Sequence, residues 1–290
     1  MIENVTIIGT GLIGASVGLA LRAAGFSGEV EGWDESPVAL ATALDIGALT
    51  TALRVRPDEE ATRPKPGLIV LAGPVHSTLD WMERLAKVVG AETLITDVGS
   101  TKSEIVQLAI RLFGGDGVAG FLPGHPMAGK ERGGAELAEA GLFREAMWLF
   151  TPCRAEQSLM DREWRTWVER FGARTMDMHA DRHDELCAWV SHLPQMLSTA
   201  FAALLEERFG DMPEVAAELM RVGGRALRET TRLGASPYSM WRDVAMTNTE
   251  NIRTTLLALE QELAYVRENL RSPELREEFA RANRFRSRRD

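Results

Sequence analysis

The chain has 290 residues, of which 45% are hydrophobic and 26% charged, and its formal net charge at pH 7 is −9. This composition is that of an ordinary globular protein of about two domains. The negative charge argues against a broad nucleic-acid interface, which needs a basic face. No basic segment followed by an apolar stretch opens the chain, so no signal peptide is indicated, and the longest apolar runs are too short to cross a membrane. Cys153 and Cys187 have neither metal-ligand nor disulfide spacing, so we expect a cytoplasmic protein without a metal site.

Short β-branched runs alternate with helical patterns through residues 1–178. Strand, helix and strand in this rhythm predict a doubly wound, Rossmann-like α/β domain that binds NAD. The predicted strands are 5–9, 28–34, 67–73 and 93–99, followed by 148–153 and 173–178, which are expected to extend the same sheet.

From residue 179 onward the pattern is helical only, which predicts a second, all-α domain over residues 179–290. Pro194 lies inside a long helical pattern, where a proline removes one hydrogen bond and kinks the helix. A regular apolar stripe follows at Ile252, Leu256, Leu259, Leu263, Val266 and Leu270. Because about 110 helical residues have little core of their own, we expect this stripe to form a homodimer. Packing within one subunit is the alternative.

The hexapeptide GTGLIG, residues 9–14, follows the first predicted strand and precedes a helical pattern. In a dinucleotide site Gly9 permits a tight turn, Gly11 lets the backbone approach a pyrophosphate, and Gly14 allows close contact between helix and strand. Asp34 ends the second predicted strand, where a carboxylate can accept hydrogen bonds from both ribose hydroxyls. Neither of the next two residues is an arginine, so the sequence favours NAD over NADP. The remaining predicted cofactor-binding residues are Leu12, Ile13 and Pro74.

Ser100 lies in TDVGSTK, residues 96–102, which ends a predicted strand and opens a helix. It is a candidate polar site residue. Thr101 and Glu104, however, form a capping-box pattern, so Ser100 is equally interpretable as a turn residue.

His125 is the single imidazole of a glycine-rich segment, GHPMAGKERGG, at residues 124–134. The glycines would let the backbone close over a ligand, and Pro126 would stiffen the residue beside the imidazole. A polar loop between two strands of a nucleotide domain favours a catalytic role for His125. A satisfied structural histidine is the alternative.

Three more candidates lie in the helical half of the chain. Arg232 is suited to a bidentate grip on a carboxylate, although a surface ion pair is the plainer interpretation. His192 and Gln195 lie three residues apart, hence on one helix face beside Pro194, and could both line a cleft.

Five segments together resemble one known family. They are GTGLIGAS, TDVGSTK, GHPMAGKERGG, HDELCAWVSHLPQ and TRLGASPYSMWRD. In this order and at these separations they resemble the prephenate/arogenate dehydrogenase (TyrA-type) family of tyrosine biosynthesis, over almost the whole chain. The resemblance implies a Rossmann-like domain, an all-helical dimerisation domain and an active site in the cleft between them.

The resemblance also implies a reaction and roles. The expected activity is NAD-dependent oxidative decarboxylation of prephenate to 4-hydroxyphenylpyruvate, or of arogenate directly to tyrosine. His125 would accept the proton of the ring hydroxyl at C4, and Ser100 would orient that imidazole or the substrate. Arg232 would bind a substrate carboxylate. The other residues expected to bind substrate are His192, Gln195 and Trp241.

Two departures from the family pattern fall in the substrate region. Gln195 stands where many relatives carry a histidine, and Ser236-Pro237-Tyr238 replaces the usual acidic SDP segment. Prephenate and arogenate both remain open as substrates, as does the 4-amino analogue of prephenate. A β-hydroxyacid dehydrogenase would normally carry a catalytic lysine on a helix of its second domain. Because no lysine follows Lys130, this class of enzyme is disfavoured. A silent NAD-sensing protein is the alternative outside enzymes. We expect no regulatory segment after residue 270 and no chorismate mutase segment within these residues.

Overall fold

A parallel sheet is the framework of the N-terminal part of the chain. The computed structural model describes residues 2–59, 64–115 and 117–288, and six strands of this part form the sheet. They are β1 (Asn4–Ile8), β2 (Glu29–Trp33), β3 (Thr51–Ala52), β4 (Leu68–Leu71), β5 (Leu94–Asp97) and β6 (Gly120–Leu122). Their order is β3-β2-β1-β4-β5-β6 with every pair parallel, which is the strand order of the doubly wound dinucleotide-binding fold. The four strands predicted first, which are β1, β2, β4 and β5, are confirmed.

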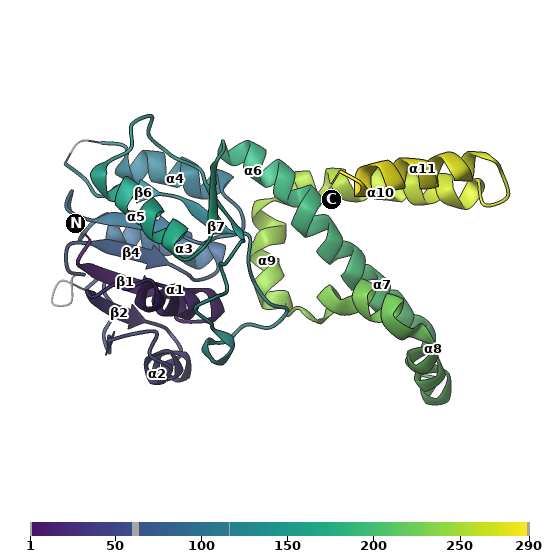
Figure 1. Cartoon of the computed structure of the whole chain (residues 1–290), viewed down its shortest axis with the longest axis horizontal. Coiled ribbons are helices and arrows are strands. Elements are labelled where there is room, and N and C mark those ends of the chain that lie inside the picture. The colour runs from purple at the N-terminus through teal and green to yellow at the C-terminus, as the bar shows by residue number, and fades with distance from the viewer. Residues whose placement is uncertain (1, 60–63, 116, 289–290) are drawn as a thin grey trace.

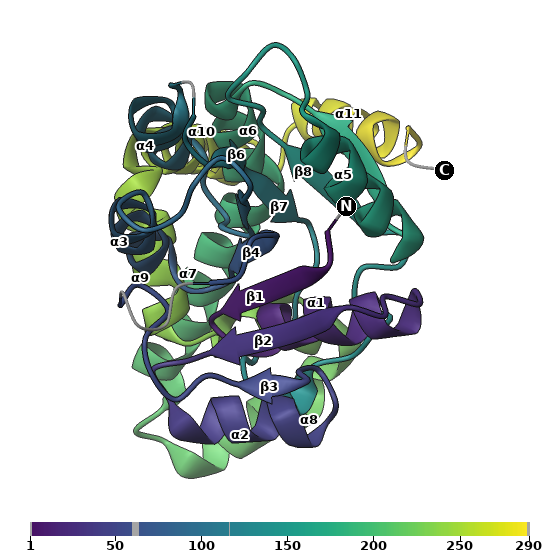
Figure 2. The same cartoon turned by 90° about the vertical axis from the view of Figure 1, so that its left-hand side faces the viewer.

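Helices connect these strands and pack on the sheet (Figure 2). They are α1 (Leu12–Ala23), α2 (Pro37–Asp45), α3 (Val75–Leu85) and α4 (Ser103–Phe113). A later helix, α5 (Leu159–Arg170), does not connect these strands but packs in one of the sheet's core clusters. In β4, Leu68 and Val70 belong to one buried cluster, whereas Ile69 and Leu71 belong to another. Because alternate side chains of a strand point to opposite faces, one apolar run of four residues serves both cores.

A second, smaller sheet follows the first. Its strands are β7 (Gly124–Pro126), β8 (Met147–Phe150) and β9 (Arg174–Asp177), and a short 3-10 helix, η2 (Ala135–Leu137), lies between β7 and β8. β7 pairs antiparallel with β8, which pairs parallel with β9. The prediction that runs 148–153 and 173–178 extend the first sheet is therefore wrong. Pro123 separates β6 from β7, and because a proline fixes φ and has no N–H, the chain turns there instead of continuing the first ladder.

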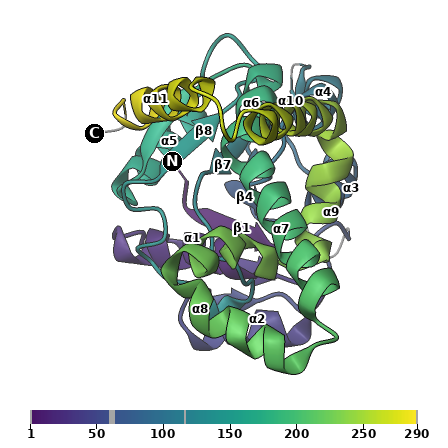
Figure 3. The ribbon, with the colours of Figure 1, turned by 90° about the vertical axis from the view of Figure 1, so that its right-hand side faces the viewer.

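The rest of the chain is helical. Its elements are α6 (Ala180–Cys187), the π-helix η3 (Ala188–His192), α7 (Leu193–Phe209), α8 (Pro213–Thr231), the 3-10 helix η4 (Arg232–Ala235), α9 (Tyr238–Thr247), α10 (Thr249–Glu268) and α11 (Glu274–Arg286). We call β1 to β9 the α/β part and α6 to α11 the helical part. In Figure 1 the pairs α7–α8 and α10–α11 extend away from the α/β part, and Figure 3 views them from their outer side.

The interruption predicted at Pro194 is confirmed. Pro194 is the second residue of α7, and the five-residue π-helix η3 directly precedes it. A π-turn inside a helix accommodates a break in the regular hydrogen-bond ladder and is frequent at functional sites. The wider turn includes His192, one of the predicted site residues.

Few apolar side chains of the helical part are buried. Within the described residues, neither α8 nor α11 has a buried residue. The predicted stripe begins at the buried Ile252 on α10, but Leu263 is 55% exposed, and Leu270 lies beyond the end of the helix. The other three residues of the stripe are half-buried, so only its C-terminal end is open to a second copy of the chain.

Polar contacts join the two parts. The hydroxyls of Thr101 and Thr247 are 2.7 Å apart, and the backbone N–H of His76 donates to the Asp243 carboxylate over 3.1 Å. No helix in residues 2–59, 64–115 and 117–288 has both the length and the apolar character needed to cross a membrane.

Candidate active site

The glycine turn after β1 has the geometry of an anion site. Gly9 has a φ of +94°, which side chains rarely adopt, and a Cβ on Gly14 would collide with the Gly9 carbonyl oxygen. Around the Cβ position of Gly11, by contrast, no described atom beyond its chain neighbours lies within 4 Å. α1 begins directly after Gly11 without a side-chain cap, so its first N–H groups can meet a phosphate.

A pocket of about 340 Å³ opens beside this turn at the carboxyl ends of β1, β2 and β4. Gly9, Gly11, Asp34 and Pro74 line it, as predicted for a cofactor site. The other predicted cofactor residues are not among its lining residues: Leu12 is buried, Ile13 packs against a core cluster, and Gly14 makes the close helix contact.

Asp34 is fixed at the mouth of this pocket by backbone donors. One carboxylate oxygen accepts from the N–H of Thr10 over 2.6 Å, and the other accepts from the N–H of Ser36 over 2.8 Å. The Thr10 hydroxyl also donates to the first oxygen over 3.2 Å, so the second oxygen is the one that keeps a lone pair for a ribose hydroxyl. Arg56 also lines the pocket, and its guanidinium lies 5.1 Å from the ring centre of Trp81. No motif in the sequence pointed to Arg56 as a pocket residue.

A buried acid holds together the two segments that carry the predicted catalytic residues. Asp97, the last residue of β5, accepts hydrogen bonds from the N–H of Gly99 over 2.7 Å and from that of Gly124 over 3.2 Å. The Lys102 ammonium pairs with the same carboxylate, and both side chains are fully buried. Sequence reasoning missed both, although an acid at the end of a strand next to a glycine turn was a signal that could have been used.

His125 lies in strand β7 and not in a loop, so that interpretation of GHPMAGKERGG is wrong for its first residues. It pairs in the antiparallel ladder with Leu149 and is 7% exposed. The backbone that carries the imidazole is therefore fixed by the hydrogen bonds between β7 and β8, and not by Pro126 alone.

The His125 ring contacts a second imidazole. Its Nδ1 lies 2.8 Å from Nε2 of His183 on α6, and Nδ1 of His183 lies 2.8 Å from the Asp184 carboxylate. Asp184 in turn accepts from the backbone N–H groups of Lys102 and Ser103 over 2.7 and 2.8 Å. Asp184 thus caps the first turn of α4.

The predicted capping box of Thr101 and Glu104 is therefore wrong. The residue before α4 is Lys102, which makes no side-chain cap, and Thr101 bonds to Thr247 instead. A carboxylate from α6 satisfies the amides that a local cap would have satisfied.

Burial keeps the two histidines neutral. It lowers the pKa of His125 well below its ordinary value, and the neighbouring His183, Lys102 and His192 add to this shift. Burial also lowers the pKa of His183, although the hydrogen bond that its ring donates to Asp184 opposes this shift. For Asp184, burial alone would raise the pKa, but hydrogen bonds with His183, Ser103 and Lys102 hold it below its ordinary value. A neutral imidazole can accept a proton at neutral pH.

Ser100 is half-buried on the same loop as Lys102. Within the described part of the chain its hydroxyl makes no hydrogen bond to His125, whose Nδ1 is engaged by His183 instead. A role for Ser100 in orienting the imidazole or the substrate stays a prediction.

His192 lies in the π-helix η3 and is 1% exposed. The Asn248 side-chain amide lies 3.2 Å from its Nδ1, so this nitrogen is the acceptor and Nε2 carries the proton. Its ring packs edge-on against Trp241, with centroids 5.9 Å apart. Among the described residues neither the Nε2 of His192 nor the Nε1 of Trp241 has a hydrogen-bond partner. Burial lowers the pKa of His192 to about 4.

Arg232 and Gln195 meet around η4. The Arg232 guanidinium forms an ion pair with Glu131, from the segment that follows β7. The Gln195 amide donates to the Leu233 carbonyl over 2.7 Å and to the Thr199 hydroxyl over 3.1 Å. Gln195 thus positions the turn that carries Arg232, while direct substrate contact by either residue stays a prediction.

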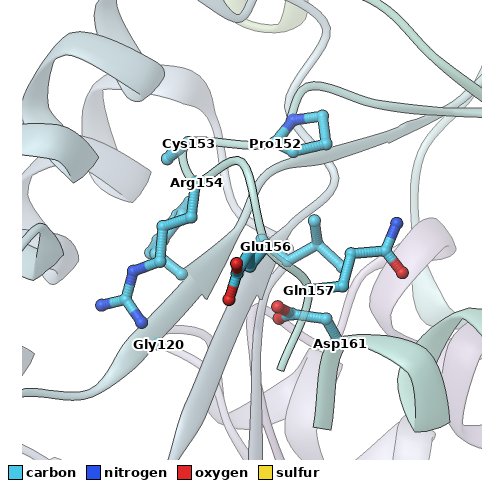
Figure 4. A pocket seen from close by; sticks show the side chains of 9 residues that line it. Gly120, Pro152, Cys153, Arg154, Glu156, Gln157 and Asp161 are labelled. Atoms are coloured by element: carbon cyan, nitrogen blue, oxygen red, sulfur yellow. The ribbon is translucent and has the colours of Figure 1, made fainter. Parts of the chain in front are cut away.

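A second, separate cavity lies beside β6 and the segment after β8 (Figure 4). Its lining includes Gly120, Cys153, Arg154 and Asp161, and its volume of about 10 Å³ is that of a single water molecule. Burial raises the pKa of Cys153 to about 12, so this thiol stays protonated. The cavity shares no lining residue with the pocket at the glycine turn.

The strand order, the glycine turn and the buried neutral histidine together define a nucleotide-dependent oxidoreductase. A family model described as the nucleotide-binding domain of prephenate dehydrogenase matches residues 17–176, and one described as its dimerization domain matches residues 179–284. The chain belongs to the prephenate dehydrogenase family, so the resemblance drawn from the five segments is confirmed. The glycine turn precedes the matched range and rests on its own geometry.

Individual relatives agree with this assignment. The chain is 33% identical to a prephenate dehydrogenase of Lactococcus lactis over 86% of its own length and 66% of that protein. It thus spans about two thirds of the length of this curated relative. A prephenate dehydrogenase of Aquifex aeolicus, crystallised with hydroxyphenyl propionate and NAD+, has a TM-score of 0.88 and 27% identity, with 100% of this chain and 99% of that chain covered. For a Synechocystis arogenate dehydrogenase the TM-score is 0.75 and the identity 26%, with 99% and 100% covered.

Proposed function

We propose that the protein catalyses the NAD-dependent oxidative decarboxylation of prephenate to 4-hydroxyphenylpyruvate. The observation that carries the proposal is His125: a buried, neutral imidazole held in a strand beside the nucleotide-binding sheet, in a chain of this family. The Aquifex relative was crystallised with a phenol that carries a three-carbon acid, which has the carbon skeleton of the proposed product.

The chemistry needs few protein groups. His125 accepts the proton of the C4 hydroxyl as the C4–H bond breaks, which is the task of a general base. When bound, NAD supplies the hydride acceptor. The ring carboxylate leaves as carbon dioxide, and its bond electrons complete the aromatic ring of the product. Positioning of the two reactants contributes the remaining rate acceleration.

NAD is the proposed cofactor because the glycine turn and Asp34 fit it. The open space at Gly11 admits a pyrophosphate, and the fixed Asp34 carboxylate has an oxygen that can accept from a ribose hydroxyl. A 2′-phosphate would place its charge against this carboxylate, which disfavours NADP. The complex of the Aquifex relative with NAD+ supports the same choice.

The proposed substrate-binding groups are hydrogen-bond donors. Arg232 binds a substrate carboxylate, which takes the place of Glu131 in the ion pair. The unpartnered N–H groups of His192 and Trp241 donate to other substrate oxygens, which would satisfy two groups that are costly to leave buried. Gln195 acts through η4, and Ser100 orients the substrate or the imidazole.

We further propose that residues 1–178 form the NAD-binding domain and residues 179–290 the domain that completes the active site and forms the homodimer. Support comes from the change of structure between Asp177 and Ala180 and from the two family matches, one of which is described as a dimerization domain.

Arogenate is the second candidate substrate. The Synechocystis arogenate dehydrogenase also shares the fold, with a TM-score of 0.75, and Gln195 stands where many relatives carry a histidine. Because a glutamine cannot become cationic, it does not repel the ammonium group that distinguishes arogenate from prephenate. The 4-amino analogue of prephenate differs from prephenate only in the group at C4 and is the third candidate.

NADH formation with NAD and either prephenate or arogenate, at matched concentrations, tests the proposal. We expect turnover of prephenate, and a loss of roughly 10² or more in kcat for His125→Asn, the scale of a lost general base. His179→Asn is the matched control, because His179 is an exposed histidine whose replacement should change the rate by less than about threefold. No turnover of either compound, or an unchanged kcat for His125→Asn, would contradict the proposal.

A further inference from the structure

We propose that His183 and Asp184 are positioning residues that fix the tautomer of His125, with the proton on Nδ1 and the basic lone pair on Nε2. The inference rests on the proposed function for its catalytic meaning, but the tautomer itself is a property of the free protein. It follows from three steps along one chain of hydrogen bonds, each of which fixes the direction of the next.

The chain starts at Asp184, which is held as a carboxylate. Its two oxygens accept from the backbone N–H groups of Lys102 and Ser103 over 2.7 and 2.8 Å. These amides belong to the N-terminal turn of α4, where the helix dipole favours a negative charge. An ionised carboxylate has no proton to donate, so every group in contact with Asp184 must be a donor.

His183 is therefore protonated on Nδ1. This nitrogen lies 2.8 Å from the Asp184 carboxylate and must donate to it. Burial lowers the pKa of His183, so the ring is neutral and holds a single proton. Its Nε2 is then left as an acceptor.

The last step fixes His125. Its Nδ1 lies 2.8 Å from the acceptor nitrogen Nε2 of His183, so Nδ1 of His125 must be the donor. The neutral His125 ring then carries its lone pair on Nε2. Nε2 of His125 is thus the basic nitrogen, while Nδ1 is occupied by its hydrogen bond to His183. The serine protease triad uses the same device, because its carboxylate holds the imidazole in the reactive tautomer.

The groups packed around the two rings support this arrangement. The Lys102 ammonium, paired with Asp97, disfavours a second positive charge on either imidazole. Cys187 contacts both rings, with its Sγ 3.6 Å from Nε2 of His183 and 4.0 Å from Nδ1 of His125. Burial raises the pKa of this thiol to about 12, so it brings no charge.

A metal ion bound by His125, His183 and Cys187 is the competing arrangement, since one ligand atom from each lies within 4.8 Å of the others. Two nitrogens on one tetrahedral zinc would be roughly 3.3 Å apart, given Zn–N bonds of about 2.0 Å. The observed 2.8 Å is the distance of a shared proton.

Nitrogen-15 NMR of the histidine-labelled protein, without substrate, tests the tautomer directly. Two-bond proton–nitrogen correlations distinguish an Nδ1–H from an Nε2–H ring. We expect Nδ1–H for both His125 and His183. An Nε2–H ring at His125 in the wild-type protein would overturn the proposal even if the enzyme proves fully active, and the spectrum remains decisive if no substrate is turned over.

Two substitutions of His183 separate positioning from packing. In His183→Gln the amide can accept from Nδ1 of His125 and donate to Asp184, whereas His183→Phe keeps the ring shape but offers no acceptor. We expect His183→Gln to retain kcat within roughly tenfold and the Nδ1–H form of His125. We expect His183→Phe to lose roughly 10² or more in kcat, with KM changed by less than about threefold.

A merely structural role predicts the reverse order, because phenylalanine preserves the packing of the ring better than glutamine does. Equal or higher kcat in His183→Phe than in His183→Gln would therefore overturn the proposal, as would a stoichiometric metal ion in the purified protein whose removal abolishes activity. His179→Gln, at an exposed position just before α6, is the control.

Discussion

The α/β part and the helical part bury different kinds of side chain. The α/β part contains two clusters of buried apolar residues, one on each face of its sheet. In the helical part the buried apolar residues are few, whereas the buried polar ones include His183, Asp184, His192, Gln195 and Asn248. The interior of the helical part is thus largely the active-site network. Its stability has to come from contacts outside itself.

Two such contacts are available. One is the junction with the α/β part, through Asp184 and the pairs Thr101–Thr247 and His76–Asp243. The other is a contact with a second copy of the chain. The dimerization-domain match and the exposed end of the α10 stripe support this contact.

The largest expected effect concerns the dimer. Leu263 on α10 is 55% exposed in the single chain, so Leu263→Asp should cost the isolated subunit little. If α10 packs against a second copy, the substitution buries one carboxylate from each subunit, at a cost of several kcal/mol. We expect sedimentation velocity to give a monomer.

The matched control is Ile110→Asp on α4, since Ile110 is 53% exposed but lies in the α/β part. It should sediment as the wild type does. A dimer that survives Leu263→Asp, or one that Ile110→Asp disrupts equally, would contradict the assignment of the stripe.

A somewhat smaller effect is expected in the α/β core. Trp164 is fully buried, with its ring edge-on to Trp148, so Trp164→Ala should lower the free energy of unfolding by about 3–5 kcal/mol. The loss should not depend on protein concentration, because the cavity lies within one chain. Urea unfolding at two protein concentrations measures it. Leu159→Ala on the same helix, at a residue that is 78% exposed, should change stability by no more than about 0.5 kcal/mol. Comparable losses in both variants would contradict the comparison.

The smallest expected effect for a single residue is the loss of folding stability when a buried histidine is protonated at acid pH. His125, His183 and His192 have pKa values lowered in the folded protein, to about 4 for His192. Below about pH 6.5 the unfolded chain therefore binds more protons than the folded one, so stability falls as pH falls, by about 1.4 kcal/mol per pH unit for each histidine. For His192 the loss continues until the pH passes about 4.

Urea unfolding between about pH 7.5 and 5.5 measures this slope. Since a glutamine does not titrate, His192→Gln should reduce the mean slope by about 0.7 kcal/mol per unit, because an unfolded histidine is on average half protonated over this pH range. An unchanged slope would mean that His192 is already charged in the folded protein.

The fold could be predicted from local patterns because its elements are local. Hydrophobic period and turn residues located β1, β2, β4 and β5, and the spacing of the glycines gave the turn that Gly9 adopts at a φ of +94°. The same patterns could not tell which sheet β8 joins, since a buried strand has the same period in either. β3 has only two residues, too few to show the alternation of apolar and polar residues that marks a strand. Because β3 could not be located, the position of Arg56 in the segment after it could not be predicted either.

The site was predictable as a set of residues but not as a network. Motifs gave His125 and Arg232, yet the partners that decide their state lie far along the chain: Asp184 caps amides about 80 residues before it, and Glu131 pairs with Arg232 about 100 residues after it. Local rules placed the cap of α4 on Thr101, its nearest hydroxyl, because a tertiary cap leaves no local sequence signal.

The cap that α6 provides to α4 has a consequence for the order of synthesis. The α/β part leaves the ribosome first and carries its own cores, so it can fold before the rest of the chain exists. At that stage the amides of Lys102 and Ser103 lack Asp184, and His125 lacks His183. A nascent chain can thus form its nucleotide pocket while the ring of His125 has no fixed orientation. The proposed reaction becomes possible only when the helical part, which is synthesised last, has docked.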